Sequence, residues 1–524
     1  MAPSGTVIGS ELSAIPQGGP WEGRDPRDPR DPAEMEIRFS EEDELAQSVA
    51  EMEVTVPEVL RVTEACQAFE HFAAALRPAC HENFFYKSQQ AESIGTFWSH
   101  SWHGNQWKKI LTLMTFYNGT AAIALGFVAA LVMMLFFSFD LLPGFYRGYY
   151  DIQWSTWCLL SALLVSSGTL LLWRPKNQVF LDRICINQAN KNMKTEAILS
   201  LAGLLRKSDT MLILWDPSWT TRLWCLFELS AFLKSSTTRK QTLVVRPIFL
   251  GRISIAVFLT LTAFNFPLTI APFDRAKMTS LLIPIGCGLL LGVSVGYWTV
   301  STVRKYFREL EVMKQQLLDI SFDLTRSTCC DLKHQGPAGE VLLCDRKVVK
   351  RCVNIWFGSQ EAFENTVRSE VLEILSRDLS ERVFTTPWVL GVTSPVVWSF
   401  MDFAASFAEN FDVDLWWRSD SICFLLEGLS IWLLAIPSIK DVMIPLSRLM
   451  QSKPASSFAE VLKNAGVSFI VSIPIMILLL CYVWTRNPNP ARRAVTFTGC
   501  TLVVSMCWSC VACALKARLR LSRC

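Results

Sequence analysis

A carboxylate and an aromatic residue lie four positions apart in an apolar stretch of the chain. Glu228 follows Trp224 by four residues, so on an α-helix the two side chains share one face. A carboxylate beside a flat ring suits the cleavage of an N-glycosidic bond, because it can stabilise or attack the oxocarbenium-like transition state while the ring stacks on the leaving base. In a purely structural interpretation, Glu228 instead pairs with Arg222 or Lys234 on the same helix.

Other polar and aromatic side chains follow segments that have the pattern of β-strands. Ligands of open α/β sheets bind beyond the carboxyl ends of the strands, at the point where the strand order reverses. We therefore expect Glu228 as the catalytic residue and the following substrate-binding residues: Ser99, His100, Trp102, Asp182, Trp215 and Trp224. The structural alternatives are a loop-ordering cap for Asp182, a satisfied structural histidine for His100, and core or membrane-interface positions for the tryptophans.

The segments that position these residues alternate between strand and helix patterns. Such alternation is typical of a parallel sheet with helices on both faces. The predicted strands are Thr96–Ser99, Gln178–Asp182, Thr210–Trp215 and Thr242–Phe249. The predicted helices are Gln106–Met114, Lys194–Arg206 and Arg222–Lys234. We expect a doubly wound α/β domain over residues 93–252, interrupted by a membrane hairpin at 117–173.

This part of the chain resembles the Toll/interleukin-receptor (TIR) family. The run Trp224-Cys225-Leu226-Phe227-Glu228-Leu229 matches the family's Trp-Cys-x-x-Glu-Leu motif, and Val245 to Phe249 resembles the strand that follows it. The run Phe180 to Gln188 is similar to the signature of fungal heterokaryon-incompatibility domains. The chain departs from the family's pattern in two respects: a membrane hairpin interrupts the domain, and the fifth strand and last helix are not evident. The fold is either truncated or completed by residues 304–382.

The resemblance implies a flavodoxin-like fold and a role in signalling. In TIR members that cleave the nicotinamide–ribose bond of NAD, the motif's glutamate is the catalytic residue, and that role falls on Glu228. Other members are adaptors without activity. TIR enzymes complete their sites across protomers, so the resemblance also implies self-association. NAD would be the substrate, and no cofactor is expected.

Four cysteines and one histidine follow the predicted domain within a short stretch. Cys329, Cys330, His334, Cys344 and Cys352 are residue types that bind zinc, but their spacing matches no pattern of two CxxC-like knuckles. We therefore expect no metal site. The chain's 17 cysteines lack the even, dense spacing of a secreted disulfide framework, which indicates that most are reduced.

The composition indicates a membrane protein. Hydrophobic residues make up 51% of the 524 residues and charged residues only 19%, and the net charge of +3 is too small to suggest a nucleic-acid partner. Six uncharged runs are about 20 residues long, as a membrane-spanning helix requires: Thr120–Phe139, Ile152–Trp173, Ile253–Phe273, Met278–Val303, Asn464–Thr485 and Ala494–Leu515. Two weaker candidates are Val383–Met401 and Ser421–Ile439.

The spans group into hairpins, and the long segments between hairpins all lie on one side of the membrane. Basic residues flank the spans on that side, which the positive-inside rule makes cytosolic, and no secretory signal peptide is evident. A turn with Arg486, Arg492 and Arg493 disagrees with this orientation. The flanking basic residues are Lys108, Lys109, Arg174, Lys176, Arg246, Arg252, Arg304, Lys305, Arg308, Lys516, Arg518, Arg520 and Arg523.

The remaining segments are expected to have simpler roles. Residues 1–58, rich in Pro, Gly and acidic side chains, are predicted to be a disordered tail, and residues 59–92 a helical lead-in. Membrane hairpins are expected at 253–303, 383–439 and 464–515, a cytosolic helical region at 304–382, a linker at 440–463, and a basic cytosolic tail at 516–524.

A channel or transporter with a regulatory TIR-like domain is the rival interpretation. Glu427 lies in a candidate span and Asp402 at the edge of another, and ionisable residues at membrane depth often mark transport pathways. Prolines inside apolar runs point the same way, because they break helices. These prolines are Pro284, Pro437 and Pro474.

Overall fold

The computed structural model of the chain describes residues 43–521 apart from 79, 81, 148–149, 237–239, 271–277, 322–324, 336–343, 382, 409–414 and 485–489. The chain divides into two compact units. Unit 1 comprises residues 1–113, 174–250 and 310–383, and unit 2 comprises residues 114–173, 251–309 and 384–524. Each unit is therefore assembled from three separate stretches of sequence.

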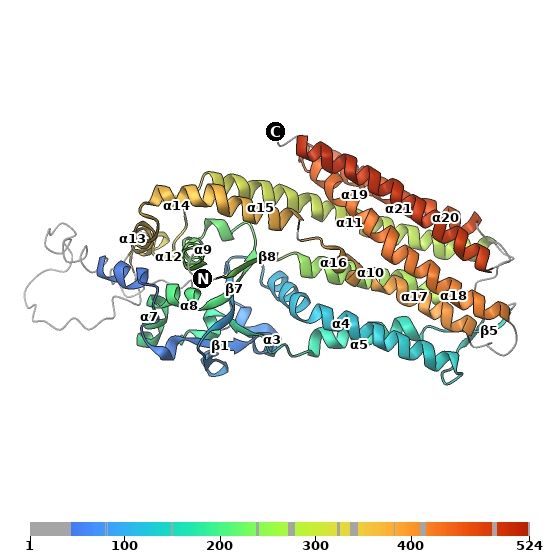
Figure 1. The fold of residues 1–524 in the computed structure, drawn as a ribbon, viewed down its shortest axis with the longest axis horizontal. Coiled ribbons are helices and arrows are strands. Elements are labelled where there is room, and N and C mark those ends of the chain that lie inside the picture. Colours follow the sequence, from blue (N-terminus) through green and yellow to red (C-terminus); the bar gives the residue numbers. More distant parts are fainter. Residues whose placement is uncertain are drawn as a thin grey trace, which may run out of the picture. The chain divides into compact units, whose positions relative to one another are not determined.

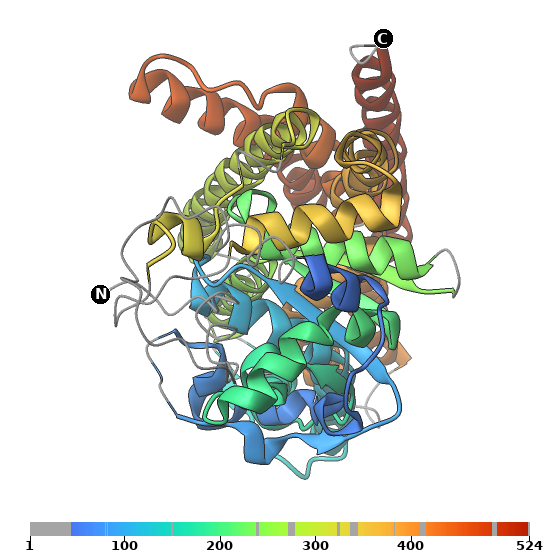
Figure 2. The same cartoon turned by 90° about the vertical axis from the view of Figure 1, so that its left-hand side faces the viewer.

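Unit 1 is built around a six-stranded mixed sheet of order β2-β1-β6-β3-β7-β8. The strands β6, β3, β7 and β8 are parallel, whereas β1 pairs antiparallel with both β6 and β2. The segments coloured blue and green, far apart in sequence, lie side by side as a result (Figure 1 and Figure 2). The strands are β1 (Arg61–Glu64), β2 (Gln89–Gln90), β3 (Ile94–His100), β6 (Gln178–Phe180), β7 (Ser208–Trp215) and β8 (Thr242–Pro247).

The centre of the sheet is apolar and buried. β3 pairs with β7 along its length, from Ile94 opposite Ser208 to His100 opposite Leu214. The carboxyl-terminal half of β7 is a continuous buried run, which is typical of a parallel strand covered on both faces. Phe97 of β3 and Phe180 of β6 stack with ring centroids 4.9 Å apart.

The sheet is mixed rather than wholly parallel, which corrects part of the sequence prediction. Both antiparallel strands come from residues 59–92, which we expected to be helical. The β-branched pair Val62 and Thr63 is fully buried in β1, where such side chains pack well. Four residues are too few for their alternation to stand out against the helical pattern of the neighbouring sequence.

Residues 310–383 belong to the same unit as the sheet. α13 packs against α9, and α15 packs against β8, so this stretch covers part of the α/β fold. The helices of unit 1 are α3 (Ala65–Ala73), α6 (Asp182–Cys185), α7 (Lys191–Leu199), α8 (Leu201–Arg206), α9 (Leu223–Ser236), α12 (Thr328–Asp331), α13 (Asp345–Phe357), α14 (Gln360–Thr366) and α15 (Leu372–Glu381). The shorter turns are η1 (Pro57–Val59), η2 (Ala74–Leu76), η3 (Phe85–Lys87), η4 (Trp219–Thr221) and the π-helix η6 (Val367–Val371).

The end of the predicted disordered tail is ordered against α13. Residues 43–50 are helical. Trp356 Nε1 donates to the Ala50 carbonyl at 2.8 Å, and Arg351 Nε lies 3.0 Å from a carboxylate oxygen of Asp43. The acidic composition of this stretch gave no sign of its buried face, which includes Ala46 and Val49. The rest of the predicted tail, residues 1–42, lies outside the described residues.

Unit 2 is helical except for one short hairpin. Within it, α17 packs against α5 and α18, and α21 packs against α18, α19 and α20 (Figure 1). The hairpin strands are β4 (Phe145–Arg147) and β5 (Tyr150–Trp154). The helices of unit 2, three of which extend into unit 1, are α4 (Gln106–Ser138), α5 (Trp157–Leu172), α10 (Leu250–Ile270), α11 (Met278–Leu318), α16 (Thr386–Val392), α17 (Ser394–Ala408), α18 (Leu415–Ser430), the π-helix η7 (Ile431–Ala435), α19 (Ile436–Leu449), α20 (Ser457–Trp484) and α21 (Pro490–Leu521).

Several described helices are suited to crossing a bilayer, which fits an integral membrane protein. A sixth candidate is the pair α16 and α17, bent by 52° at the break between them. The five single helices with the necessary length and hydropathy are Gln106–Ser138, Leu250–Pro267, Asp420–Leu449, Ser457–Cys481 and Arg492–Leu521.

One expected span is shorter in the structure, and one of the weaker candidates lies in a long apolar stretch. The predicted run Ile152–Trp173 contains only the 16-residue helix α5, because its first residues form β5. By contrast, the weaker candidate Ser421–Ile439 lies inside the 30-residue apolar stretch Asp420–Leu449. The predicted run Met278–Val303 lies in α11, most of whose amino-terminal half falls outside the residues with described side chains.

Candidate functional site

A hydrogen-bonded serine and glutamate lie at the carboxyl end of the central strand. Ser99, the second-last residue of β3, donates from Oγ to Glu228 Oε2 of α9 at 2.5 Å. Trp219 of η4 is fully buried and donates from Nε1 to Ser99 Oγ at 3.0 Å. The serine oxygen is therefore fixed between an indole N–H and the carboxyl group, and its proton points to the carboxyl.

Burial controls the protonation of Glu228. Burial of the carboxyl raises the pKa of Glu228 from 4.5 to about 8, because little water reaches the charged form. The hydrogen bond from Ser99 opposes this rise, and the negative charge of Asp182 adds to it. At neutral pH the carboxyl is mostly protonated, so it can donate a hydrogen bond as well as accept one.

Three other predicted residues lie together at the same edge of the sheet. Trp102 donates from Nε1 to Asp182 Oδ2 at 3.0 Å, and the His100 and Trp102 rings meet edge to face at 4.5 Å. Asp182 also accepts the backbone N–H of Arg183 at 2.7 Å, as its loop-ordering interpretation requires. The Arg183 guanidinium lies 5.6 Å from the Trp102 ring centroid, so a cation already occupies one side of this ring.

His100 is a neutral, buried imidazole. Burial lowers the pKa of His100 from 6.5 to about 4, and the positive charge of Lys109 lowers it further. Among the described residues, no hydrogen-bond partner lies within reach of His100 Nε2. A buried ring nitrogen without a protein partner is costly, and a ligand or water would satisfy it.

Two of the predicted tryptophans have different surroundings. Trp215 is fully buried at the end of β7 and belongs to the core. Trp224 lies toward α13, where its Nε1 donates to Asp345 Oδ2 at 3.4 Å, and its ring meets Phe227 at 5.4 Å. The indole is therefore held by α13, whereas the Glu228 carboxyl is held by Ser99 of β3.

A polar network beside the site was missed by the sequence analysis. Lys109, expected to flank a membrane span, is buried and donates from Nζ to the Ser101 carbonyl. Ser218 donates from Oγ toward Asp216 and lies 2.8 Å from Ser101 Oγ. The buried Lys109 ammonium interacts electrostatically with the buried Asp216 carboxylate, which links the start of α4 to the loop after β7. The only sequence signal was a second lysine next to Lys108 at the start of an apolar helix.

A shallow cavity of about 410 Å³ lies between η4 and the carboxyl-terminal end of α11. Its wall includes Thr220, whose Oγ1 donates to Gln316 Oε1 at 2.7 Å. None of the predicted site residues lines this cavity. It therefore does not define a binding volume for the Ser99–Glu228 pair.

The buried acids of unit 2 that favoured a channel have protein partners. Asp402 of α17 accepts hydrogen bonds from Ser155 Oγ and from the backbone N–H groups of Cys158 and Leu159, all at 2.8 to 2.9 Å. The two N–H groups belong to the first turn of α5 and have no partner within that helix, so Asp402 caps α5 from another segment. This geometry assigns Asp402 a structural role.

Glu427 is fully buried and lies 3.0 Å from Arg493, which also lies 3.0 Å from Asp420. Arg493 is itself buried, and the Glu427 and Asp420 carboxylates compensate its charge within unit 2. This pairing gives Arg493 a structural role inside unit 2. The neighbouring Arg492 is exposed, and Arg486 lies outside the described residues.

One group of side chains in the described part of the chain has the composition of a metal site. Cys329, Cys330, His334 and Cys344 bring their sulfur and nitrogen atoms within 4.8 Å of one another. Cys352, the fifth residue considered in the sequence, lies apart from them on α13 and donates from Sγ to the Ala46 carbonyl.

Comparison with known proteins identifies no relative of the chain. No protein-family model matches the sequence, and neither a curated protein nor a solved structure matches it.

Proposed function

We propose that the chain is a membrane-anchored signalling protein whose TIR-like domain hydrolyses NAD or a related nucleotide at its N-glycosidic bond. The observation that carries the proposal is the Ser99–Glu228 hydrogen bond at the carboxyl end of the central parallel strand. It joins a motif residue of α9 to the strand end where ligands of open α/β sheets bind. His100, Trp102 and Asp182 lie at the same edge.

The order of the parallel strands supports the TIR-like fold. Along the chain, β3 is the first parallel strand, β6 the second, β7 the third and β8 the fourth. Their order in space is second, first, third, fourth, as in flavodoxin-like doubly wound sheets. The strand order reverses at β3, so the switch point lies between β3 and β7, beside Ser99.

The protonation state of Glu228 suits a cationic substrate. The nicotinamide ring of NAD carries a positive charge, which would favour the ionised carboxylate when the ring lies near it. The carboxylate could then stabilise the oxocarbenium-like transition state or attack it. Ser99 and Trp219 would hold the carboxylate in place without adding charge, and the neutral His100 could accept a hydrogen bond from a hydroxyl group.

Self-association would complete the active site. The resemblance implies a site shared between protomers, and anchoring in one bilayer raises the local concentration of the domains. Activity should therefore be higher for protein clustered on liposomes than for protein dispersed in detergent.

The test is to measure NAD consumption and nicotinamide release by the full-length protein in both states. Glu228→Ala should abolish release. Glu373→Ala, which changes an exposed glutamate of α15, should retain it. Equal release by wild type and Glu228→Ala would overturn the assignment of Glu228. Absence of release from folded, clustered wild type would overturn hydrolysis.

The second candidate is a non-catalytic TIR-like interaction scaffold. It is favoured by the mutual satisfaction of Ser99 and Glu228 and by the use of both Asp182 oxygens within the protein. A scaffold would self-associate without consuming NAD. A third role, as a channel or transporter, predicts solute or ion flux into liposomes above that of empty liposomes; the structural partners of Asp402 and Glu427 argue against it.

A further inference from the structure

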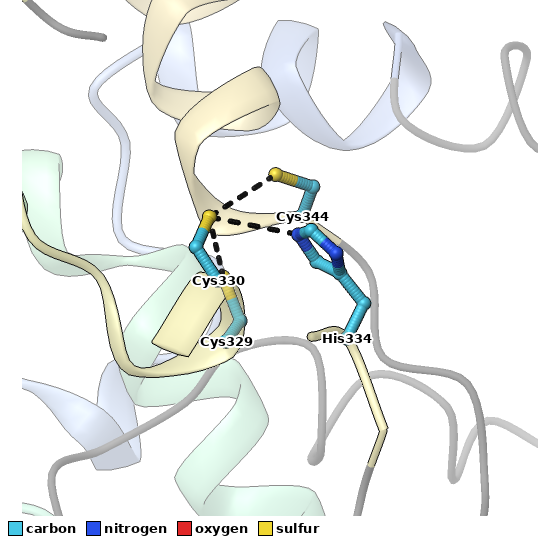
Figure 3. Close-up of side chains that lie close together, drawn as sticks. All are labelled: Cys329, Cys330, His334 and Cys344. Carbon is cyan, nitrogen blue, oxygen red and sulfur yellow. Dashed lines mark hydrogen bonds between the residues drawn. The ribbon is translucent and has the colours of Figure 1, made fainter. Parts of the chain in front are cut away.

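The four-residue group at α12 has the geometry of a closed metal site. Cys330 Sγ is its centre: it lies 3.8 Å from Cys329 Sγ, 3.9 Å from Cys344 Sγ and 3.5 Å from His334 Nε2 (Figure 3). In a tetrahedral zinc site, Zn–S bonds of about 2.3 Å and Zn–N bonds of about 2.0 Å place sulfurs about 3.8 Å apart and sulfur and nitrogen about 3.5 Å apart. The three separations from Cys330 Sγ agree with this arrangement, and all four ligand atoms lie within 4.8 Å of one another.

The backbone brings the histidine back to the two adjacent cysteines. After α12, the N–H of His334 donates to the Cys329 carbonyl at 2.8 Å, and the N–H of Lys333 donates to the Cys330 carbonyl at 3.0 Å. This is a Schellman motif. Lys333 and His334 both have positive φ, at 53° and 59°, where side chains other than glycine are strained. This turn presents the His334 imidazole to the two adjacent cysteines, with Nε2 3.5 Å from Cys330 Sγ.

We propose that Cys329, Cys330, His334 and Cys344 bind one zinc ion. Three thiolates and one imidazole form a complete tetrahedral set, and a closed set with no open position is typical of structural rather than catalytic zinc. Iron–sulfur clusters usually take four cysteines, which this group lacks. The spacing of these residues did not predict the site, because adjacent cysteines and a distant fourth ligand resemble no two-knuckle pattern.

The zinc ion would fasten this segment to the helix that carries Glu228. Arg326 pairs with the start of α9 through its backbone: its N–H donates to the Thr221 carbonyl at 2.8 Å, and its carbonyl accepts from Leu223 at 3.2 Å. Asp345, next to Cys344, accepts from Trp224 of α9 and from Ser327. Zinc would thus close a loop whose two sides both contact α9.

The first test is the metal content of full-length protein purified without added metal or chelator. Elemental analysis should find one zinc per chain in wild type and almost none in Cys330→Ser or Cys344→Ser. The matched control is Cys352→Ser, which replaces a buried cysteine outside the group and should retain zinc. Wild type without zinc, even after incubation with zinc in reductant, or loss of zinc only in Cys352→Ser, would overturn the proposal.

A second test does not depend on whether the variants fold. Wild type loaded with Co²⁺ should show the visible absorption of a tetrahedral, thiolate-bound cobalt ion, and added Zn²⁺ should displace it. Alkylation of the zinc-bound wild type should leave Cys329, Cys330 and Cys344 protected until a chelator is added. Octahedral cobalt spectra, stoichiometric iron or copper instead of zinc, or a disulfide between any two of these cysteines in protein kept reduced would contradict the proposal.

Discussion

The raised pKa of Glu228 makes a quantitative prediction about stability. An unfolded chain ionises this carboxyl near its ordinary pKa of 4.5, whereas the folded chain retains the proton up to about pH 8. Between these values the folded state binds more protons than the unfolded state, so rising pH favours unfolding. Glu228→Gln removes the titration and keeps a carbonyl oxygen that can accept from Ser99. The variant should therefore gain stability over wild type as pH rises through this window.

The size of the effect follows from the two pKa values. A difference of 3.5 between about 8 and 4.5 corresponds to an upper limit of about 5 kcal/mol, since one pKa unit is about 1.4 kcal/mol. Glu228 as a whole residue is half-buried, although its carboxyl is enclosed, so solvent screening lowers this limit and we expect about 2 kcal/mol. For a domain of this size, that corresponds to a melting-temperature difference of about 4 to 8 °C.

The assay compares melting temperatures of the full-length protein in detergent at pH 5 and pH 9. Glu228→Gln should melt close to wild type at pH 5 and several degrees above it at pH 9. Glu373→Gln, an exposed change on α15, should follow wild type at both values. The reasoning is refuted if the melting difference between Glu228→Gln and wild type is the same at pH 5 and pH 9, or is larger at pH 5.

Three further perturbations test the packing around the site and in the helices. Ser99→Ala leaves the buried Trp219 Nε1 and the Glu228 carboxyl without this partner, so the free energy of unfolding should fall by about 1 to 3 kcal/mol. The fall is measured as a lower melting temperature, and Ser99→Thr should retain more stability than Ser99→Ala. Asp402→Ala removes the cap of α5, so the free energy of unfolding should fall by about 2 to 4 kcal/mol, with Asp402→Asn intermediate. Equal melting temperatures of wild type, Asp402→Ala and Asp402→Asn would contradict the capping role. Arg493→Leu removes the buried cation that both Glu427 and Asp420 contact, so the free energy of unfolding should fall by about 3 to 5 kcal/mol. Adding Glu427→Leu and Asp420→Leu should restore part of this loss, and a triple variant less stable than Arg493→Leu would count against the ion-pair account.

The sequence predicted the central strands well because their patterns are strong and local. The run before Trp215 is continuously apolar and forms β7, and the predicted strand at Thr96–Ser99 forms the middle of β3. The helix that carries Glu228 also forms where its pattern indicated. Its direction toward Ser99 could not be read from the sequence, because it depends on how α9 packs on a sheet that residues 120 positions apart build together.

The residues that escaped prediction depend on distant contacts. Lys109 has the pattern of a membrane-flanking charge, and only the fold shows that it reaches the Ser101 carbonyl. His334 approaches Cys330 because of a turn with positive φ at two residues other than glycine, which no spacing rule anticipates. Asp402 and Glu427 suggested an ion pathway in isolation, whereas their partners lie on other helices.

The most direct test of the account is nicotinamide release from NAD by full-length protein clustered on liposomes, with Glu228→Gln as the comparison. The variant keeps the shape of the side chain and the acceptor for Ser99 but cannot ionise. The account predicts release by wild type and none by Glu228→Gln, although the two proteins melt alike at pH 5. Release at the wild-type rate by the variant would contradict the central claim that Glu228 is the reactive carboxylate.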